Sequence, residues 1–141
     1  MIGTPYWMAP EVVNDESDDG AGAYDSRCDI WSLAITAIEL ADGVPPLTKH
    51  APMKALMMIP VKPPPTLPNK GKRWSEHFVA FVKAALVKDF TKRPRAMALT
   101  LHKWITKIDR KAAMATLEEH CNVLFPYVME EEDDEWHAEG Q

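Results

Sequence analysis

Cysteine is scarce in this chain of 141 residues, because only Cys28 and Cys121 are present and neither belongs to a CxxC pair. Two isolated thiols exclude a disulfide framework and a cysteine-based metal centre. No apolar run approaches the roughly 18 residues that a membrane-spanning helix requires. The N-terminus also lacks the basic stretch and apolar stretch of a signal peptide. The sequence therefore predicts a cytoplasmic protein with no membrane partner.

Metal-ligand spacing is missing as well. The sequence contains five histidines, and no two of them form an HxxxH pair. Histidine ligands of zinc usually come in such closely spaced pairs. We therefore expect no metal site and no metal cofactor in this chain; the histidines are His50, His77, His102, His120 and His137.

Basic residues are absent from the last part of the chain. From Leu117 onward there are nine acidic residues and no Lys or Arg, whereas the preceding part has 16 basic and 12 acidic residues. A nucleic-acid binder concentrates basic residues on one face, so this distribution argues against a nucleic-acid partner. Like charges repel one another along residues 130–135, which predicts an acidic, disordered tail over 130–141.

The apolar pattern, together with an apolar fraction of 46 %, predicts an all-α body around one central helix. Between Asp29 and Ala41 apolar residues cover the full circumference of a helix, which is typical of a buried helix with no solvent-facing stripe. Asp29 stands where the N-cap of this helix is expected, and Gly43 follows its expected end.

Shorter helices are predicted on both sides of the central one. Their expected ranges are 10–13, 52–58, a helix that follows the N-cap Ser75, 96–104 and 111–124. Residues 60–68 contain five prolines, so this segment is expected to be an extended connector; a proline-rich ligand for an aromatic groove is the alternative. Met53, Met57 and Met58 have helical spacing, which indicates core positions or a docking face.

Three motifs carry a resemblance to a known family. Residues Gly3–Glu11 read GTPYWMAPE, Asp29–Leu40 read DIWSLAITAIEL, and Lys88–Pro94 read KDFTKRP. They resemble, in this order, the end of a protein-kinase activation segment, the central kinase helix, and a late Arg-Pro element. The amino-acid sequences of the first two motifs resemble those of the sterile-twenty group of serine/threonine kinases. Three further segments are most similar to the kinase domain of class III myosins: residues 42–47, 59–65 and 102–108.

The resemblance implies a partial kinase C-lobe. A kinase also needs a Gly-rich loop, a strand Lys, His-Arg-Asp and Asp-Phe-Gly, and the sequence contains none of these motifs. We therefore expect the distal half of a C-lobe over 1–108, without the N-lobe and the catalytic loop. A partly helical extension over 109–129 and the acidic tail follow. ATP and Mg²⁺ are implied for the full-length family, and this chain alone is expected neither to bind Mg·ATP nor to phosphorylate a protein.

The resemblance also assigns roles to individual residues, none of them catalytic. Thr4, Pro5, Trp7 and Met8 match the residues that position a protein substrate, and Trp7 is expected to be an exposed aromatic. Ala9, Pro10 and Glu11 match the family's Ala-Pro-Glu signature. Glu11 and Arg93 match an ion pair that ties the activation segment to the lobe, because a guanidinium can bind a carboxylate through two hydrogen bonds. Asp29 and Trp31 match structural positions of the central helix.

Two functions follow from these residues. The first is the substrate-groove portion of a serine/threonine protein kinase, whose partner is a protein substrate. The second is a non-catalytic regulatory or binding module derived from a kinase C-lobe, which presents the groove and the helix at 52–58 to a protein partner.

Overall fold

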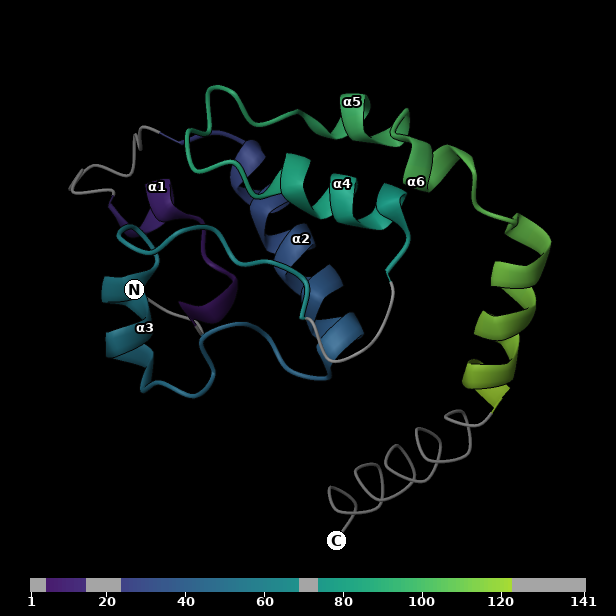
Figure 1. Ribbon diagram of the computed structural model, residues 1–141, viewed down its shortest axis with the longest axis horizontal. Helices are drawn as coiled ribbons and strands as arrows, with labels where there is room; N and C mark the ends of the chain where they lie inside the picture. The colour runs from purple at the N-terminus through teal and green to yellow at the C-terminus, as the bar shows by residue number, and fades with distance from the viewer. Residues whose placement is uncertain (1–4, 15–23, 69–73, 123–141) are drawn as a thin grey trace, which may run out of the picture. The chain divides into compact units, whose positions relative to one another are not determined.

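The computed structural model describes residues 5–14, 24–68 and 74–122 (Figure 1). All regular structure in these ranges is helical, which confirms the predicted class. The elements are the 3₁₀ helix η1 (Pro5–Trp7) and the α-helices α1 (Pro10–Val13), α2 (Arg27–Asp42), α3 (Pro52–Met58), α4 (Glu76–Ala85), α5 (Ala96–Thr100) and α6 (Lys103–Thr106). The chain divides into one compact unit up to Thr106 and a second from Lys107 onward.

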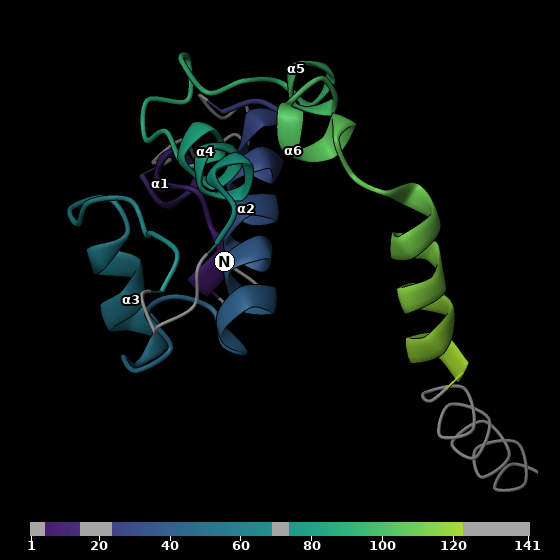
Figure 2. The same ribbon diagram turned by 45° about the vertical axis from the view of Figure 1, so that its right-hand side comes forward.

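Helix α2 forms the centre of the first unit. α4 packs against one side of it, and η1 lies between α2 and α3 (Figures 1 and 2). The buried residues of α2 form a single cluster with those of α4. Because removing apolar surface from water stabilises a fold by roughly 25 cal/mol per Å², this contact stabilises the unit. The α2 members of the cluster are Ile30, Trp31, Ala34, Ile35 and Ile38.

Two predictions about α2 were wrong. The helix begins at Arg27, so Asp29 lies inside its first turn and is not the N-cap; that position belongs to Ser26, whose side chain makes no capping hydrogen bond. The helix also has a solvent-facing stripe, because Leu33 is 49 % and Leu40 83 % exposed. The physical reason is that α4 and η1, which pack on α2, cover only part of its circumference.

The end of α2 and the start of α3 match their predicted positions. Gly43 has a left-handed backbone with φ of 87°, and its N–H donates to the carbonyl of Glu39 at 2.6 Å. Glycine adopts this conformation without the steric cost that a Cβ brings. Pro52 occupies the first turn of α3, where its missing N–H removes no hydrogen bond. Met53 and Met57 of this helix are exposed, so they are not core residues.

Helix α4 also begins where the sequence predicts. The Ser75 Oγ accepts a hydrogen bond from the Phe78 N–H at 3.2 Å, and the buried residues of α4 are Phe81, Val82 and Ala85. The connector that the sequence predicts to be extended over 60–68 precedes α4. It begins with a turn, in which the N–H groups of Val61 and Lys62 donate to the Met58 carbonyl at 3.1 and 2.8 Å, so only residues 63–68 have neither helix nor turn structure.

The single helix predicted over 96–104 was wrong, because two short helices occupy this range. α5 ends at Thr100 and α6 begins at Lys103. Between them the His102 Nδ1 accepts a hydrogen bond from the Trp104 N–H at 3.1 Å, which caps the second helix. The Trp104 ring lies 4.7 Å from that of Phe78 and 4.6 Å from that of Phe81, between ring centres. This aromatic contact holds α6 on α4.

The described part of the second unit contains a helix over residues 110–122. Asp109 caps it, because its Oδ1 accepts a hydrogen bond from the Ala112 N–H at 3.1 Å. The helix predicted over 111–124 is thus confirmed through residue 122. Residues 123–124 and the predicted acidic tail lie outside the described residues. Across the described ranges, no helix combines the length and the apolar character that crossing a membrane requires.

Candidate functional site

The segment from η1 to α1 is fixed to the core by small and rigid residues. Pro5, Ala9 and Pro10 are buried. The N–H of Met8 donates to the Pro5 carbonyl at 3.0 Å, and Pro10 starts α1 at a position where a proline costs no hydrogen bond. This segment therefore has a defined backbone. Thr4, which was expected to position a substrate, lies outside the described residues.

The carboxylate of Glu11 forms the predicted ion pair with Arg93. The two residues are 82 positions apart in the sequence, and both carboxylate oxygens are bound: Oε1 by Nη1 at 2.5 Å and Oε2 by Nη2 at 2.9 Å. Arg93 is only 2 % exposed. Such a two-pronged contact combines charge with fixed geometry. The pair ties α1 to the turn before α5, as the resemblance implied.

The rest of the Arg93 guanidinium is also bound. Its Nε donates to the Val87 carbonyl at 2.9 Å and its Nη1 to the Arg27 carbonyl at 2.7 Å. A buried charge is tolerated when its hydrogen-bonding capacity is met, so Arg93 joins three chain segments. The sequence did not point to these two acceptors, because backbone carbonyls leave no residue-type signal.

Trp7 is connected to α2 through two hydrogen bonds that the sequence analysis missed. Its indole Nε1 donates to the Glu39 Oε2 at 2.9 Å, and its carbonyl accepts from the Ser32 Oγ at 2.8 Å. The side chain is half-buried against the core, so the expectation of an exposed aromatic was wrong. Glu39 and Ser32 lie two turns apart on α2, and helical spacing alone could have placed them on one face.

The neighbouring Tyr6 is fixed from a different direction. Its hydroxyl donates to the carbonyl of His50 at 2.8 Å, in the loop between α2 and α3. The Tyr6 and Trp7 rings meet edge to face with 6.1 Å between their centres. η1 therefore presents two anchored aromatic side chains, while Met8 beside them is half-buried.

A charged cluster surrounds the start of α2. Arg27 binds both carboxylate oxygens of Asp25, and its Nη1 donates to the Thr91 carbonyl at 2.8 Å. The hydrogen bonds from the Arg27 side chain and backbone lower the pKa of Asp25 to about 2. Burial raises the pKa of the Cys28 thiol, with help from the charge of Asp29. A thiol of this kind stays protonated and unreactive at neutral pH.

Asp29, expected at a structural position, has an exposed side chain in the first turn of α2. The Cys28 thiol contacts its Oδ1 at 3.8 Å. Trp31 is buried, as predicted for the core. The structure therefore brings together Trp7, Glu11, Trp31 and Arg93 around the start and middle of α2, and it leaves Asp29 at the solvent edge.

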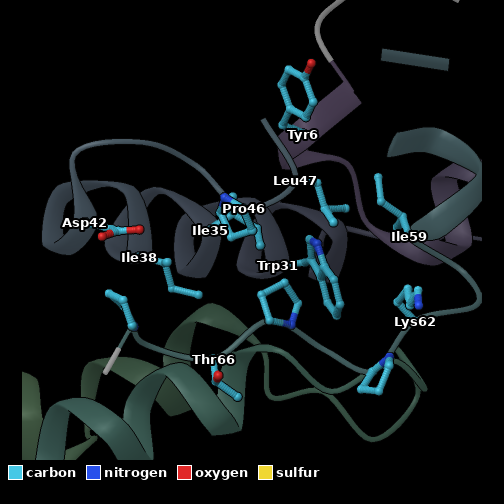
Figure 3. A pocket seen from close by; sticks show the side chains of 13 residues that line it. Tyr6, Trp31, Ile35, Ile38, Asp42, Pro46, Leu47, Ile59, Lys62 and Thr66 are labelled. Carbon is cyan, nitrogen blue, oxygen red and sulfur yellow. The ribbon is translucent and has the colours of Figure 1, made fainter. Parts of the chain in front are cut away.

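A cavity of about 310 Å³ opens next to Tyr6 (Figure 3). Trp31, Ile35 and Ile38 of α2 form one wall of it, and Leu47 and Ile59 lie near Tyr6 on the other side. Lys62 and Thr66 add polar groups. The cavity adjoins the segment that carries the expected substrate-positioning residues.

The described residues contain no metal-binding arrangement. Within the ranges 5–14, 24–68 and 74–122, no three His, Cys, Asp or Glu side chains come together as ligands. Hard cations such as Mg²⁺ prefer several oxygen ligands. These residues therefore do not fit the magnesium ion that the kinase resemblance implies.

Comparison with known proteins finds the same family that the sequence motifs resemble. The family model described as protein kinase domain matches residues 1–105. The chain is 50 % identical over 113 residues to Myosin-IIIa of Homo sapiens and 47 % identical over 124 residues to the serine/threonine-protein kinase mig-15 of Caenorhabditis elegans. It is 55 % identical over 95 residues to Misshapen-like kinase 1 of Rattus norvegicus.

The matched stretch is a large part of this chain and a small part of its relatives. The alignment covers 80 % of the chain and 7 % of human Myosin-IIIa, 86 % and 11 % for mig-15, and 67 % and 7 % for the rat kinase. The relatives include class III myosins and other sterile-twenty-group kinases.

Proposed function

Because this chain belongs to the protein kinase family, we propose that its described residues form the substrate-positioning and structural portion of a serine/threonine protein kinase. The observation that carries the proposal is the ion pair between Glu11 and Arg93, which fixes α1 to the helical body. Positioning and electrostatics carry most of the catalysis in phosphoryl transfer. A firmly held groove is therefore a functional part in its own right.

In this proposal the segment Thr4–Met8 lines the groove for a protein substrate. Support comes from the hydrogen bonds that hold Trp7 to Glu39 and Ser32. Ala9, Pro10 and Glu11 attach this segment to the body. Trp31 and Arg93 supply the surface to which it is attached, and Asp29 has a structural role at the start of α2. The protein substrate is the proposed partner, and no nucleic acid or membrane is proposed.

The kinase family also implies ATP, whose γ-phosphoryl group is the one transferred. Nucleotide affinity in kinases depends on a Gly-rich loop, a strand Lys and metal-holding Asp and Asn residues, and the sequence contains none of the motifs that carry them. We therefore propose that the 141 residues alone neither bind Mg·ATP nor transfer phosphate. The cytoplasmic location and the domain boundary at 108 stay predictions from the sequence.

A chimera tests this proposal. Residues 1–105 of this chain replace the matching segment in the kinase domain of human Myosin-IIIa, and phosphorylation of a peptide substrate is measured. We expect activity to be retained, because the transplanted part supplies the groove. Trp7→Ala in the chimera should raise the KM for the peptide and leave the KM for ATP unchanged, because Trp7 positions only the peptide.

The isolated chain provides the second measurement, a calorimetric titration with Mg·ATP. We expect no saturable binding of Mg·ATP. Saturable binding that is lost on changing Asp29 to Asn would contradict the proposal.

The alternative function, a non-catalytic module that presents the groove and α3 to a protein, is favoured by the exposure of Met53 and Met57. A chimera that binds Mg·ATP and unfolds cooperatively but phosphorylates nothing would support this alternative.

A further inference from the structure

A second hollow lies between α4 and the proline-rich arm of residues 63–67. This arm also lines the cavity beside Tyr6, but residues 5–13 are not among the lining residues of the second hollow. Its volume is about 800 Å³, which is within the range of ligand-binding clefts. One wall is the arm and the other is a face of α4 with the residues that follow it. The lining residues are Pro63, Pro64, Pro65, Thr66, Leu67, Val79, Val82, Lys83, Leu86, Val87 and Lys88.

The arm is anchored by hydrogen bonds at both ends. At its start, the Lys88 Nζ donates to the carbonyl of Pro60 and, at 3.0 Å, to that of Lys62. At its other end, the Trp74 Nε1 donates to the Pro68 carbonyl at 3.0 Å. Three consecutive prolines fix the backbone dihedral φ between these anchors. The arm, and with it this wall of the cleft, therefore has a defined backbone conformation.

The floor of the cleft is apolar and is continuous with the core. Val82 and Leu86 are buried, whereas Val79, one helical turn before Val82, is 46 % exposed. Residues at this spacing share one face of a helix. An apolar side chain that enters the cleft would meet Val79 at the surface and the core residues below it.

The charged side chains that line the cleft are basic. Its lining includes Lys83 and Lys88 and no acidic residue. An apolar cleft with a cationic border is complementary to a ligand that is both apolar and acidic.

We propose that this cleft is a docking site for an acidic, amphipathic helical segment of a partner protein, separate from the proposed substrate groove. Apolar residues at i, i+3 and i+4 of the partner enter between α4 and the arm, as in other helix-in-groove complexes. Its carboxylates face Lys83. The concave shape favours a peptide over a lipid surface, because membrane binding requires apolar side chains that project outward.

The test uses the full chain and two fluorescent peptides in anisotropy titrations. Both peptides have leucines at helical spacing; one has glutamates on its polar side and the other lysines. We expect the acidic peptide to bind saturably and the basic one at least about tenfold more weakly. Binding of the acidic peptide should weaken as the salt concentration rises, because the contributing charges lie at the surface.

Matched variants locate the binding. Lys83→Glu should weaken binding about fivefold, since it reverses an exposed charge at the border. Val79→Glu should weaken it about tenfold or more, because it puts a charge in the apolar cleft. Lys103→Glu and Met97→Glu alter exposed residues on α6 and α5, outside the cleft lining, and should change the affinity by less than about twofold. Thermal unfolding of each variant verifies that it is folded.

Three results would overturn the proposal. One is equal affinity for both peptides, or no saturable binding of either. Another is a Lys83-dependent association with phosphatidylserine vesicles in the absence of peptide binding, which would assign the cleft to lipid. The last is a dimer in sedimentation that Val79→Glu dissociates, which would assign it to a second copy of the chain.

Discussion

The guanidinium of Arg93 lies 5.3 Å from the ring centre of Trp31 while its terminal nitrogens bind the carboxylate of Glu11. A planar cation can stack on an aromatic face and bind a carboxylate through two hydrogen bonds at once, whereas an ammonium group cannot. α1 and α2 are therefore linked through one side chain. The fold depends on the shape of this group as well as on its charge.

The first prediction concerns the loss of that side chain. Arg93→Met should reduce the free energy of unfolding by roughly 3–5 kcal/mol, because it leaves the Glu11 carboxylate without its partner in a poorly solvated place. Arg93→Lys should also destabilise the chain, since a lysine cannot reproduce the double hydrogen bond. Urea unfolding followed by circular dichroism measures both effects.

Arg95→Met is the matched control for Arg93→Met. Arg95 pairs with Asp25 at 3.2 Å, but 67 % of its side chain is exposed, so its removal should cost about 1 kcal/mol or less. The double variant Glu11→Gln/Arg93→Met should lose less than the sum of the two single variants. Additive losses would mean that the two groups do not stabilise each other.

The second prediction concerns the anchor of Trp7. Trp7→Phe retains most of the ring and removes the N–H that donates to Glu39. Hydrogen bonds to charged groups contribute about 1.5–3 kcal/mol, so we expect a loss of this size in urea unfolding. In the Myosin-IIIa chimera the same change should raise the KM for the peptide, because η1 is no longer fixed to α2.

Glu39→Gln separates the hydrogen bond from the ring. The amide oxygen still accepts from the Trp7 indole, so this variant should lose less stability than Trp7→Phe. If Glu39→Gln were as damaging as Trp7→Phe, the charge of Glu39 would have a role apart from this contact.

The ion pair and several helix bounds could be predicted from the sequence, because they depend on local signals or on a family motif. Gly43, Pro52 and Ser75 mark helix ends through their own backbone or side-chain chemistry. The exposure of Leu33 and Leu40 could not be predicted in this way. An all-apolar helix indicates burial only if neighbours surround it, and that depends on tertiary contacts.

The break between α5 and α6 was missed for a related reason. The apolar pattern continues through residues 96–104, and nothing in it signals that a histidine side chain interrupts the backbone hydrogen bonds. His102 does so by accepting from the Trp104 N–H. Glu39 and the two backbone carbonyls that accept hydrogen bonds from Arg93 were missed because they are partners of predicted residues and carry no motif of their own.

The third prediction compares two serines at helix starts. The Ser75 Oγ accepts the Phe78 N–H, whereas Ser26 makes no side-chain capping bond. Ser75→Ala should therefore cost about 1 kcal/mol of stability and Ser26→Ala less than about 0.5 kcal/mol. Urea unfolding of the two variants in parallel measures the difference. Equal losses would show that the capping bond does not contribute.

The last prediction concerns the acid range. The hydrogen bonds from Arg27 lower the pKa of Asp25 from the ordinary 3.8 to about 2. Because the pKa of Asp25 is lower in the folded state, its carboxylate stabilises the fold when the pH is above the pKa of the unfolded state. This contribution disappears as the pH falls through the pKa of the folded state. The carboxyl carbon signal of Asp25 in NMR should accordingly titrate with a midpoint near 2, well below that of an unpaired Asp.

Two substitutions distinguish the contributions to this shift. Arg27→Gln should move the Asp25 midpoint up towards 3.8, because Arg27 supplies the largest effects on its pKa, and Arg95→Gln should move it less, because Arg95 supplies the smallest. The order follows from geometry: Arg27 reaches both carboxylate oxygens, whereas the Arg95 contact to Oδ2 is longer at 3.2 Å. A midpoint that stays near 2 in the Arg27→Gln variant would mean that other groups hold the Asp25 charge.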